Sequence, residues 1–179
     1  LLSYQVSSSE GPSFAKAKDR PSPYILASII SRPPQVPYDI LLIDAGAEHG
    51  IKIGMAATAF GDILLGSVTE VFAKISKVKL ISFPEEETNV MIQSQGQQTR
   101  LPDMQISAIA IGKGGENLEI KLPSSIEIKS GDQIMAMGTF PLSVGVVEKV
   151  EINLSDPFQK ILFRLPLNLQ YLKYVMVDK

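Results

Sequence analysis

The sequence predicts an all-β protein made of two small six-stranded β-barrel subdomains, and three observations lead to this fold class. Apolar and β-branched runs of roughly five to eight residues recur, with turn residues about every eight to twelve positions, which is typical of barrels and sandwiches. No stretch of about a dozen residues shows the helical period of about 3.6 residues. Finally, one segment recurs later in the chain, which indicates an internal duplication.

The first predicted unit covers residues 24–95. Its expected strands are separated by prolines and glycines, which disturb a central strand but are tolerated between strands. These strands cover residues 24–31, 39–43, 55–60, 63–71, 77–83 and 90–93. A hairpin turn is expected at Gly61-Asp62, between the third and the fourth strand.

The second predicted unit covers residues 96–179. Its expected strands cover residues 104–111, 118–122, 133–137, 142–152, 160–165 and 174–177. A hairpin turn is expected at Gly112–Gly115, and residues 168–171 are compatible with one turn of helix. Two closed barrels would remove the exposed edges that open sheets of this size would have. An exchange of strands between the two units is left open.

The repeated segment runs from Asp39 to Val71 and returns, less well preserved, from Leu118. Corresponding positions are Ile43 and Ile120, Lys52 and Lys129, and Gly54 and Gly131, each 77 positions apart, followed by Gly66 and Gly145 at a spacing of 79. A similar strand precedes each copy. Several features in the same order at nearly constant spacing favour duplication of one β unit. The alternative, that any all-β chain with regular turns looks self-similar, stays open.

Five glycines at strand entries and bends are predicted to have structural roles. They are Gly50, Gly54, Gly66, Gly131 and Gly145. We expect each of them to supply a positive φ or a close backbone approach, which residues with a Cβ atom supply less readily.

Residues 1–23 are predicted to be a linker, flexible or partly helical, or the end of a truncated stalk. Serines and prolines are frequent there, and few apolar residues occur beyond Leu1, Leu2 and Phe14. Such a segment cannot bury enough apolar surface to offset the entropy lost on ordering. Because the chain opens without a methionine, we expect it to be part of a longer protein.

Composition excludes several classes of function. The 179 residues carry a formal net charge of -2 and no clustered lysines or arginines, which argues against a nucleic-acid partner. Cysteine is absent, so thiol catalysis, disulfides and cysteine-based zinc sites are excluded. No apolar run approaches the roughly 18 residues that a membrane span requires.

No catalytic, cofactor-binding or metal-binding residues are predicted. The single histidine, His49, lies in a polar turn between two strands, where a solvated surface residue is expected and not a general base. The aspartates fall mostly at turn positions that favour them for local hydrogen bonding. The segment Gly112–Gly115 lacks the following helix and the Ser or Thr of a phosphate-binding loop. We therefore expect no enzyme, and a protease-like double barrel remains a disfavoured alternative.

Several segments, taken in order, resemble the extracytoplasmic β-barrel core of the rod shape-determining MreC family. They are residues 39–55, 64–68, 79–84, 131–134, 140–147 and 172–177. In that family a strand ends in an Asp-x-Gly turn and is followed by Gly-Val-Lys-x-Gly-Met and Gly-x-Val-Gly-x-Val. The resemblance covers roughly residues 24–179. Two departures are a compressed segment at residues 137–141 and fewer aromatic residues at residues 36–39, where a partner contact could therefore differ.

The resemblance implies a non-catalytic scaffold of the cell-elongation machinery, which synthesises lateral peptidoglycan and maintains rod shape. It implies an extracytoplasmic (periplasmic) location, with anchoring by an N-terminal transmembrane helix that this sequence lacks. It also implies self-association into a dimer or filament. The implied partners are MreD, a class B penicillin-binding transpeptidase that the scaffold would activate, RodA and, indirectly, MreB. Neither a cofactor nor nucleic acid is implied.

The partner-binding face is not evident from the sequence. Phe60 and Phe140 lie at expected hairpin tips and are weak candidates, because aromatic residues are frequent at interface hot spots. The main alternative function is a periplasmic adaptor of the membrane-fusion type, which shares turns such as Lys129–Asp132. That class would require a long α-helical hairpin, and no heptad pattern interrupts this chain.

Overall fold

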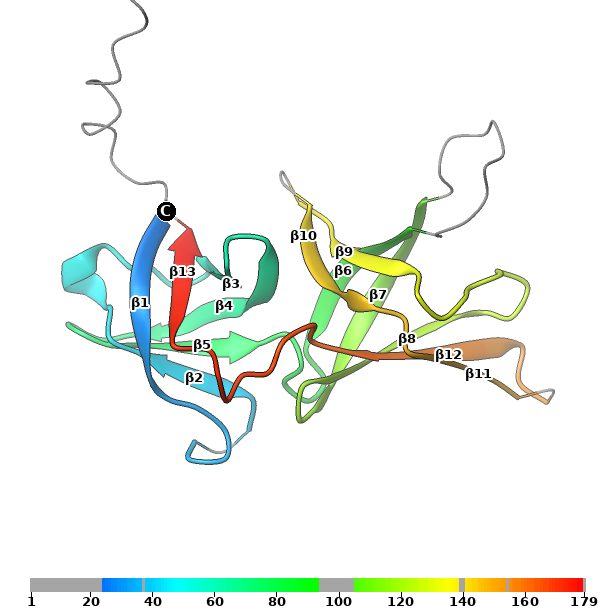
Figure 1. Ribbon diagram of the computed structural model, residues 1–179, viewed down its shortest axis with the longest axis horizontal. Coiled ribbons are helices and arrows are strands. Elements are labelled where there is room, and N and C mark those ends of the chain that lie inside the picture. Colours follow the sequence, from blue (N-terminus) through cyan, green and yellow to red (C-terminus); the bar gives the residue numbers. More distant parts are fainter. Residues whose placement is uncertain (1–23, 37, 94–104, 139–140, 154, 179) are drawn as a thin grey trace, which may run out of the picture.

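The computed structural model describes residues 24–36, 38–93, 105–138, 141–153 and 155–178, and this part of the chain is almost entirely β. It contains thirteen strands and one short 3-10 helix, η2 (Ala47–His49). Figure 1 shows two lobes side by side, the first built around β1 to β5 and the second around β6 to β12. Within these described ranges, no helix is long and apolar enough to cross a membrane.

The first lobe is a closed six-stranded barrel. Its strands are β1 (Tyr24–Ser31), β2 (Ile40–Ile43), β3 (Ala56–Ala59), β4 (Ile63–Val71), β5 (Ser76–Leu80) and β13 (Tyr174–Asp178). They are hydrogen-bonded in the order β4-β3-β13-β1-β2-β5, and β5 pairs back with β4 to close the ring. A six-stranded barrel is thereby confirmed for this lobe, with its sixth strand supplied from far along the chain.

The barrel interior is filled by alternate side chains of each strand, as the two-residue period of a strand requires. On β5, for example, Val78 and Leu80 are fully buried while Lys77 and Lys79 face outward. Leu41 of β2 pairs with Val78 and is also fully buried. The core is completed by Ala27, Ile43, Ala45, Ile51, Ala57, Ala59, Leu65, Val68, Leu169, Leu172, Val175 and Val177.

The second lobe has its own apolar core and seven strands. These are β6 (Glu87–Gln93), β7 (Gln105–Gly114), β8 (Asn117–Pro123), β9 (Gln133–Ala136), β10 (Leu142–Val146), β11 (Lys149–Ile152) and β12 (Phe158–Arg164). They pair in the order β11-β12-β8-β7-β6-β9-β10. The largest buried core side chain is that of Phe163. Pairings among the described strands do not join β11 to β10, so a second closed six-stranded barrel stays a prediction.

A buried carboxylate holds the two lobes together. Asp39, just before β2 of the barrel, is only 4% exposed. Its two carboxylate oxygens accept the backbone N–H groups of Gly115 and Glu116, each at 3.2 Å, at the tip of the β7–β8 hairpin. Hydrogen bonds to an ionised acceptor are stronger than neutral ones. The hairpin tip of the second lobe is therefore fixed to the barrel.

The segment that leaves the barrel after β5 packs closely along β7. The Gly112 N–H donates to the Glu86 carbonyl at 2.8 Å, and the Gly114 N–H donates to the Ser82 carbonyl at 2.7 Å. A Cβ atom on Gly112 would overlap the Phe83 carbonyl. The predicted hairpin at Gly112–Gly115 is present, but β7 continues through Gly114 and the turn lies at Gly115 and Glu116.

The strand-entry turn has the same geometry in both copies of the repeated segment. Gly54 has a φ of 87° and its N–H donates to the Val68 carbonyl at 2.8 Å. Gly131 has a φ of 98° and its N–H donates to the Val147 carbonyl at 2.9 Å. In each copy the valine N–H donates back, at 2.9 Å, to the residue that follows the glycine. This local agreement supports duplication, while the duplication of the whole unit stays a prediction.

Another corresponding pair of glycines lies where backbones approach closely. A Cβ atom on Gly66 would overlap the Lys79 carbonyl, whereas one on Gly145 would lie 2.8 Å from the Arg164 carbonyl and 2.8 Å from the Phe163 ring. Gly50, with a φ of 85°, follows η2 as its C-cap.

Two sequence-based expectations differ from the structure. The strand expected over residues 142–152 is two strands, because the N–H and carbonyl of Val147 bond the turn at residues 131–132 and leave the ladder. Residues 169–171 form a turn and no helix, with the Tyr171 N–H donating to the Asn168 carbonyl at 3.2 Å and the Leu172 N–H donating to the Leu169 carbonyl at 3.3 Å.

Strand pairing crosses the predicted division between residues 95 and 96 twice. Strand β6 pairs with β7 and β9 of the second lobe, and β13 pairs with β1 and β3 of the barrel. The division of the chain into two units at that point stays a prediction.

Candidate partner-binding surface

The outer face of the barrel carries large apolar side chains on β1. Tyr24, Leu26 and Ile30 are 40%, 58% and 51% exposed, whereas Ala27 between them is buried. Successive side chains of a strand point to opposite faces, so these three share the outer face. Because the solvated face of an antiparallel sheet is normally polar, three large exposed apolar side chains on one face of a strand indicate an interaction surface.

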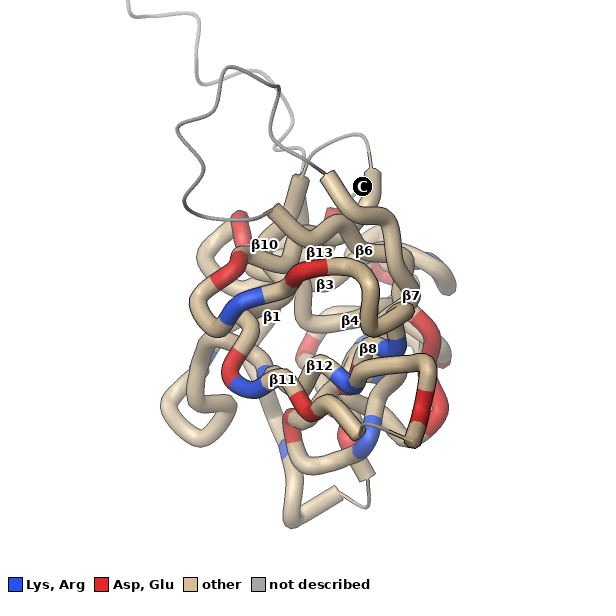
Figure 2. The backbone as a smooth tube through the Cα atoms, turned by 90° about the vertical axis from the view of Figure 1, so that its right-hand side faces the viewer, with Lys and Arg blue, Asp and Glu red and all other residues tan. Residues whose placement is uncertain are grey.

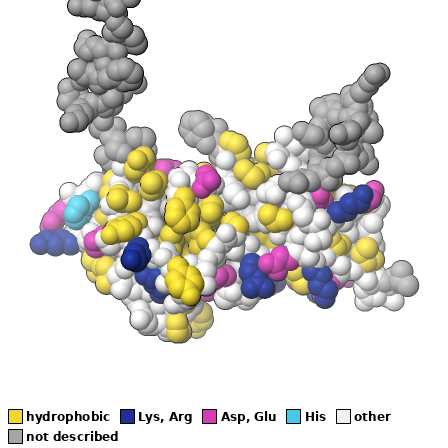
Figure 3. All heavy atoms as spheres, viewed as in Figure 1, with side chains coloured by type: hydrophobic (Ala, Val, Ile, Leu, Met, Phe, Trp, Pro, Cys, Tyr) yellow, Lys and Arg dark blue, Asp and Glu magenta, His cyan; other side chains and the backbone are white. Residues whose placement is uncertain are grey.

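Strand β13 extends this apolar face. Leu26 pairs with Met176, and Ser28 pairs with Tyr174. Tyr174 is 54% exposed. Residues directly opposite on paired strands have Cβ atoms about 5 Å apart, so the apolar side chains of β1 and β13 form one patch. Figure 3 shows hydrophobic side chains gathered over this lobe.

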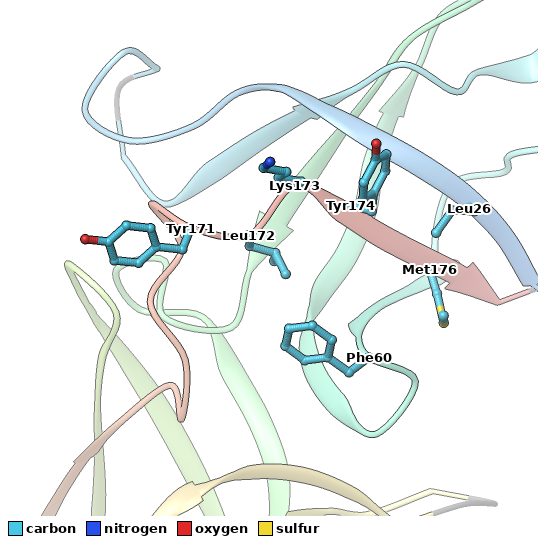
Figure 4. A pocket seen from close by; sticks show the side chains of 7 residues that line it. All are labelled: Leu26, Phe60, Tyr171, Leu172, Lys173, Tyr174 and Met176. Atoms are coloured by element: carbon cyan, nitrogen blue, oxygen red, sulfur yellow. The ribbon is translucent and has the colours of Figure 1, made fainter.

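A groove of about 370 Å³ lies on this face. It is lined by Leu26, Phe60, Tyr171, Leu172, Lys173, Tyr174 and Met176. Figure 4 shows the Phe60 ring directed toward Leu172, with Leu26 beside Met176 on the neighbouring strands. The lining is thus contributed by three separate parts of the chain: β1, the β3–β4 hairpin, and the segment entering β13. We call this feature the barrel groove.

The β3–β4 hairpin brings Phe60 to the rim of the barrel groove. Phe60 is 73% exposed and has a φ of 55°, and Gly61 follows with a φ of 86°. A positive φ is uncommon for a residue with a bulky side chain. The paired strands on either side, with Ala59 opposite Ile63, hold the turn in this conformation. An aromatic side chain exposed on a constrained turn is suited to anchoring a partner.

Arg32 fixes the loop that precedes β13. Its Nη1 donates to the carbonyls of Leu169 and Leu172, each at 2.6 Å, and to that of Gln170 at 3.0 Å. The two N–H groups of this guanidinium nitrogen are shared among the three carbonyls and position the short loop against the barrel. The loop therefore presents Tyr171, which is 83% exposed, at one end of the barrel groove.

The structure describes only one of the two candidate anchor residues, Phe60 and Phe140. Phe60 lies in the barrel groove, and its role in partner binding stays a prediction, whereas Phe140 lies outside the described residues. Sequence reasoning missed the outward-facing residues Leu26 and Tyr174. The signal for Leu26 was available, because β1 is apolar at both odd and even positions and therefore has two apolar faces.

The single histidine has a local structural contact. His49 is exposed at the end of η2, and its Nδ1 accepts the Gly46 N–H at 3.2 Å. Among the described residues it has no hydrogen bond to a serine or an aspartate. Nor do those residues contain a group of three or more His, Cys, Asp or Glu side chains that could hold a metal ion.

A second hollow, of about 440 Å³, lies beside β12 and is more polar. Within its lining, Arg164 Nε and Glu148 Oε1 form an ion pair at 3.0 Å. The pKa of Glu116 is raised from its ordinary value, first by burial and then by the charge of Asp39, while the charge of Arg164 opposes this increase. Because its lining is more polar and includes the paired charges of Arg164 and Glu148, this hollow is a poorer candidate for docking an apolar partner than the barrel groove.

Comparison with known proteins identifies the family. Residues 29–179 match the family described as "Rod shape-determining protein MreC, barrel core". The cell shape-determining protein MreC of Listeria monocytogenes is 33% identical over 135 residues, which cover 70% of this chain and 43% of that protein. The chain therefore spans less than half the length of this relative.

Solved structures share the fold. The MreC structure from Pseudomonas aeruginosa has a TM-score of 0.74 at 23% identity, covering 87% of this chain and 99% of that one. The major periplasmic domain of the cell shape-determining filament MreC has a TM-score of 0.66 at 25% identity, covering 86% and 93%. A complex between penicillin-binding protein PBP2 and MreC from Helicobacter pylori gives a TM-score of 0.57 at 15% identity, covering 87% and 98%. On the match over residues 29–179, this chain belongs to the MreC family of rod shape-determining proteins.

Proposed function

We propose that this chain is the extracytoplasmic, non-catalytic part of a scaffold that binds a cell-wall synthase through the barrel groove. The observation that carries the proposal is the group of exposed apolar side chains from β1, β13 and the Phe60 hairpin that line the barrel groove. An apolar face on the outside of a closed barrel has no role in the barrel's own core. A protein partner that buries this face would remove it from water, which is favourable by about 25 cal/mol per Å² of apolar surface.

The family match supports this proposal and argues against the two alternatives. A shape-determining protein that holds an assembly together needs interaction surfaces and no reacting groups. The complex between PBP2 and MreC from Helicobacter pylori concerns those two proteins, and its 15% identity to this chain shows a common fold alone. It nevertheless makes a class B penicillin-binding transpeptidase the natural partner to test. Neither a periplasmic adaptor nor a protease-like barrel accounts for the match over residues 29–179.

We extend the proposal to the whole protein. Anchoring by an N-terminal transmembrane helix, self-association into a dimer or filament, activation of the transpeptidase, and contacts with MreD, RodA and, indirectly, MreB are the family properties that would place this domain in the elongation machinery. The match to the Listeria relative covers 43% of that protein, so these properties are proposed for the whole protein and do not rest on the described residues. Sedimentation of this chain alone tests whether the described domains suffice for self-association.

The synthase-binding proposal is tested with the chain and the extracytoplasmic part of the transpeptidase from the same organism. Binding is followed by biolayer interferometry with wild type, Phe60→Ala and Leu26→Ala. Phe72→Ala is the matched control, because Phe72 is 48% exposed on the same barrel but does not line the groove. We expect each groove variant to weaken binding by roughly tenfold or more, as truncation of interface anchors does.

The control variant should bind within about twofold of wild type. If the wild-type complex forms and both groove variants bind as tightly as Phe72→Ala, the groove is not the synthase-binding surface. All variants alter exposed side chains, so unchanged thermal unfolding provides the check on folding.

A further inference from the structure

The barrel groove has one charged side chain in its lining, that of Lys173. Lys173 is exposed, and its ammonium forms no ion pair among the described residues. Its backbone is fixed, because its carbonyl accepts the Ile29 N–H at 2.9 Å where β1 and the start of β13 meet. Figure 4 shows its side chain beside Tyr174, at the edge of the groove. The groove is thus apolar, with a single positive charge at its edge.

This charge has no counterpart inside the groove. The other six lining residues are apolar or aromatic, and none carries a carboxylate. A partner that covers the groove would take the Lys173 ammonium partly out of water, and an unpaired buried charge is costly. A partner carboxylate placed opposite would remove that cost and steer the approach of the two surfaces.

We propose that the barrel groove receives a segment of the partner protein that carries a carboxylate next to its apolar anchor residues, and that Lys173 pairs with this carboxylate. The inference rests on the synthase-binding function proposed above and adds the chemistry of the occupant. Lys173 is then the residue that selects among apolar segments. The groove volume of about 370 Å³ is at the lower end of ligand-sized sites, so it accommodates a few side chains of such a segment.

The groove fits a protein segment better than a lipid surface. Binding to an anionic membrane depends on several lysines and arginines near the apolar residues. Here one lysine lies in the groove lining and the whole chain has a net charge of -2. The feature is also a hollow, whereas insertion among lipid headgroups favours protruding apolar side chains.

The test measures association of the chain with the extracytoplasmic part of the cognate transpeptidase at about 50 mM and about 300 mM salt, which shortens the screening length from roughly 14 Å to below 6 Å. Variants are Lys173→Glu and Lys173→Arg. Lys74→Glu is the matched control, because Lys74 is exposed on the β4–β5 turn of the same barrel and does not line the groove. We expect Lys173→Glu to slow association by roughly three- to tenfold at low salt, and Lys74→Glu to stay within about twofold.

Further outcomes decide the proposal. Lys173→Arg should keep near-wild-type binding. Replacing one partner carboxylate with a positively charged side chain should restore the affinity of Lys173→Glu. Such a rescue would not occur if Lys173 had only a structural role. Equal binding and salt dependence of Lys173→Glu and wild type would overturn the carboxylate pairing. If Phe60→Ala still weakens binding in that case, the synthase-binding groove stands without this pairing. Binding to phosphatidylglycerol vesicles that is lost in Lys173→Glu, with transpeptidase binding unchanged, would overturn the proposal in favour of a membrane.

Discussion

The two lobes differ in whether they have a free strand edge and in how apolar or charged their outer surfaces are. The barrel is closed, so it has no free strand edge, and its outer face is apolar over β1 and β13. In the second lobe, β11 pairs with β12 alone, and ion pairs such as Lys149–Glu151 at 2.6 Å and Arg164–Glu148 at 3.0 Å surround it. Figure 2 shows acidic and basic residues interspersed around β11, β12 and β8 at this end.

This difference assigns two requirements to different lobes: the second lobe must avoid unwanted strand pairing, and the barrel can present a binding surface. Charged residues on an edge strand discourage unwanted pairing with other chains, and dispersed charges keep a surface solvated. A closed barrel needs no such protection, so its outer face is free to be apolar and to bind. The comparison therefore predicts that the barrel is sensitive at buried and groove positions, whereas the outer strand of the second lobe is tolerant.

The largest effect is expected from a charge in the barrel core. Val177 of β13 is fully buried, whereas Ile152 of β11 is 61% exposed. Val177→Asp should destabilise the protein by about 4 kcal/mol or more, because a buried carboxylate without a partner is costly. Ile152→Asp should change stability by less than about 0.5 kcal/mol. Urea unfolding followed by circular dichroism gives both values, and similar losses at the two sites would contradict the contrast between the lobes.

Corresponding glycines offer a comparison at equivalent positions of the repeat. An added Cβ atom overlaps the Lys79 carbonyl at Gly66, but has more room at Gly145, where the Arg164 carbonyl and the Phe163 ring each lie at 2.8 Å. We expect Gly66→Ala to cost about 3 kcal/mol and Gly145→Ala about 1 to 2 kcal/mol, because overpacking forces the backbone to shift. Thermal unfolding provides the measurement. A larger loss for Gly145→Ala would mean that the barrel is the more deformable lobe.

The Asp39 contact tests whether the lobes are independent. Asp39→Ala removes the acceptor for the Gly115 and Glu116 N–H groups, which are then left without that partner at the interface. The expected loss is about 2 kcal/mol, together with faster hydrogen exchange at these two amides. Asp39→Asn, which retains one acceptor oxygen, should lose less. Unchanged exchange at both amides in Asp39→Ala would show that the carboxylate does not hold the hairpin tip.

The smallest effect concerns the pH dependence of Glu116. Its pKa is raised from 4.5 in the folded protein, mainly by burial. The folded state therefore holds the proton more tightly than the unfolded state, and stability falls as pH rises from about 4.5 through the raised pKa. Glu116→Gln should be more stable than wild type at pH 7, by at most about 0.5 kcal/mol, because Glu116 is only partly buried and solvent screens its charge. The difference should disappear below about pH 4, and a difference of opposite sign at pH 7 would contradict it.

Most strands were predictable from the sequence, because prolines and glycines bound the apolar runs and the two-residue alternation is clear in segments such as β5. Assigning β13 to the barrel was not predictable, because the choice between two lobes depends on pairing far along the chain. The role of Asp39 was hidden as well, since a turn aspartate that bonds its own loop has the same local sequence as one that reaches another lobe. The barrel groove depends on the placement of β13, and so only Phe60, on a local hairpin, was predicted from the sequence.

The late position of β13 means that the groove forms only after the chain has been synthesised through Met176. Four of its seven lining residues lie between Tyr171 and Tyr174, and a fifth is Met176. As the chain is synthesised from its amino end, residues 24–80 leave the ribosome with five of the barrel's six strands and no complete binding face. We expect a nascent or prematurely terminated chain to be unable to engage the synthase. On the proposed function, synthase binding would then be restricted to chains that include β13.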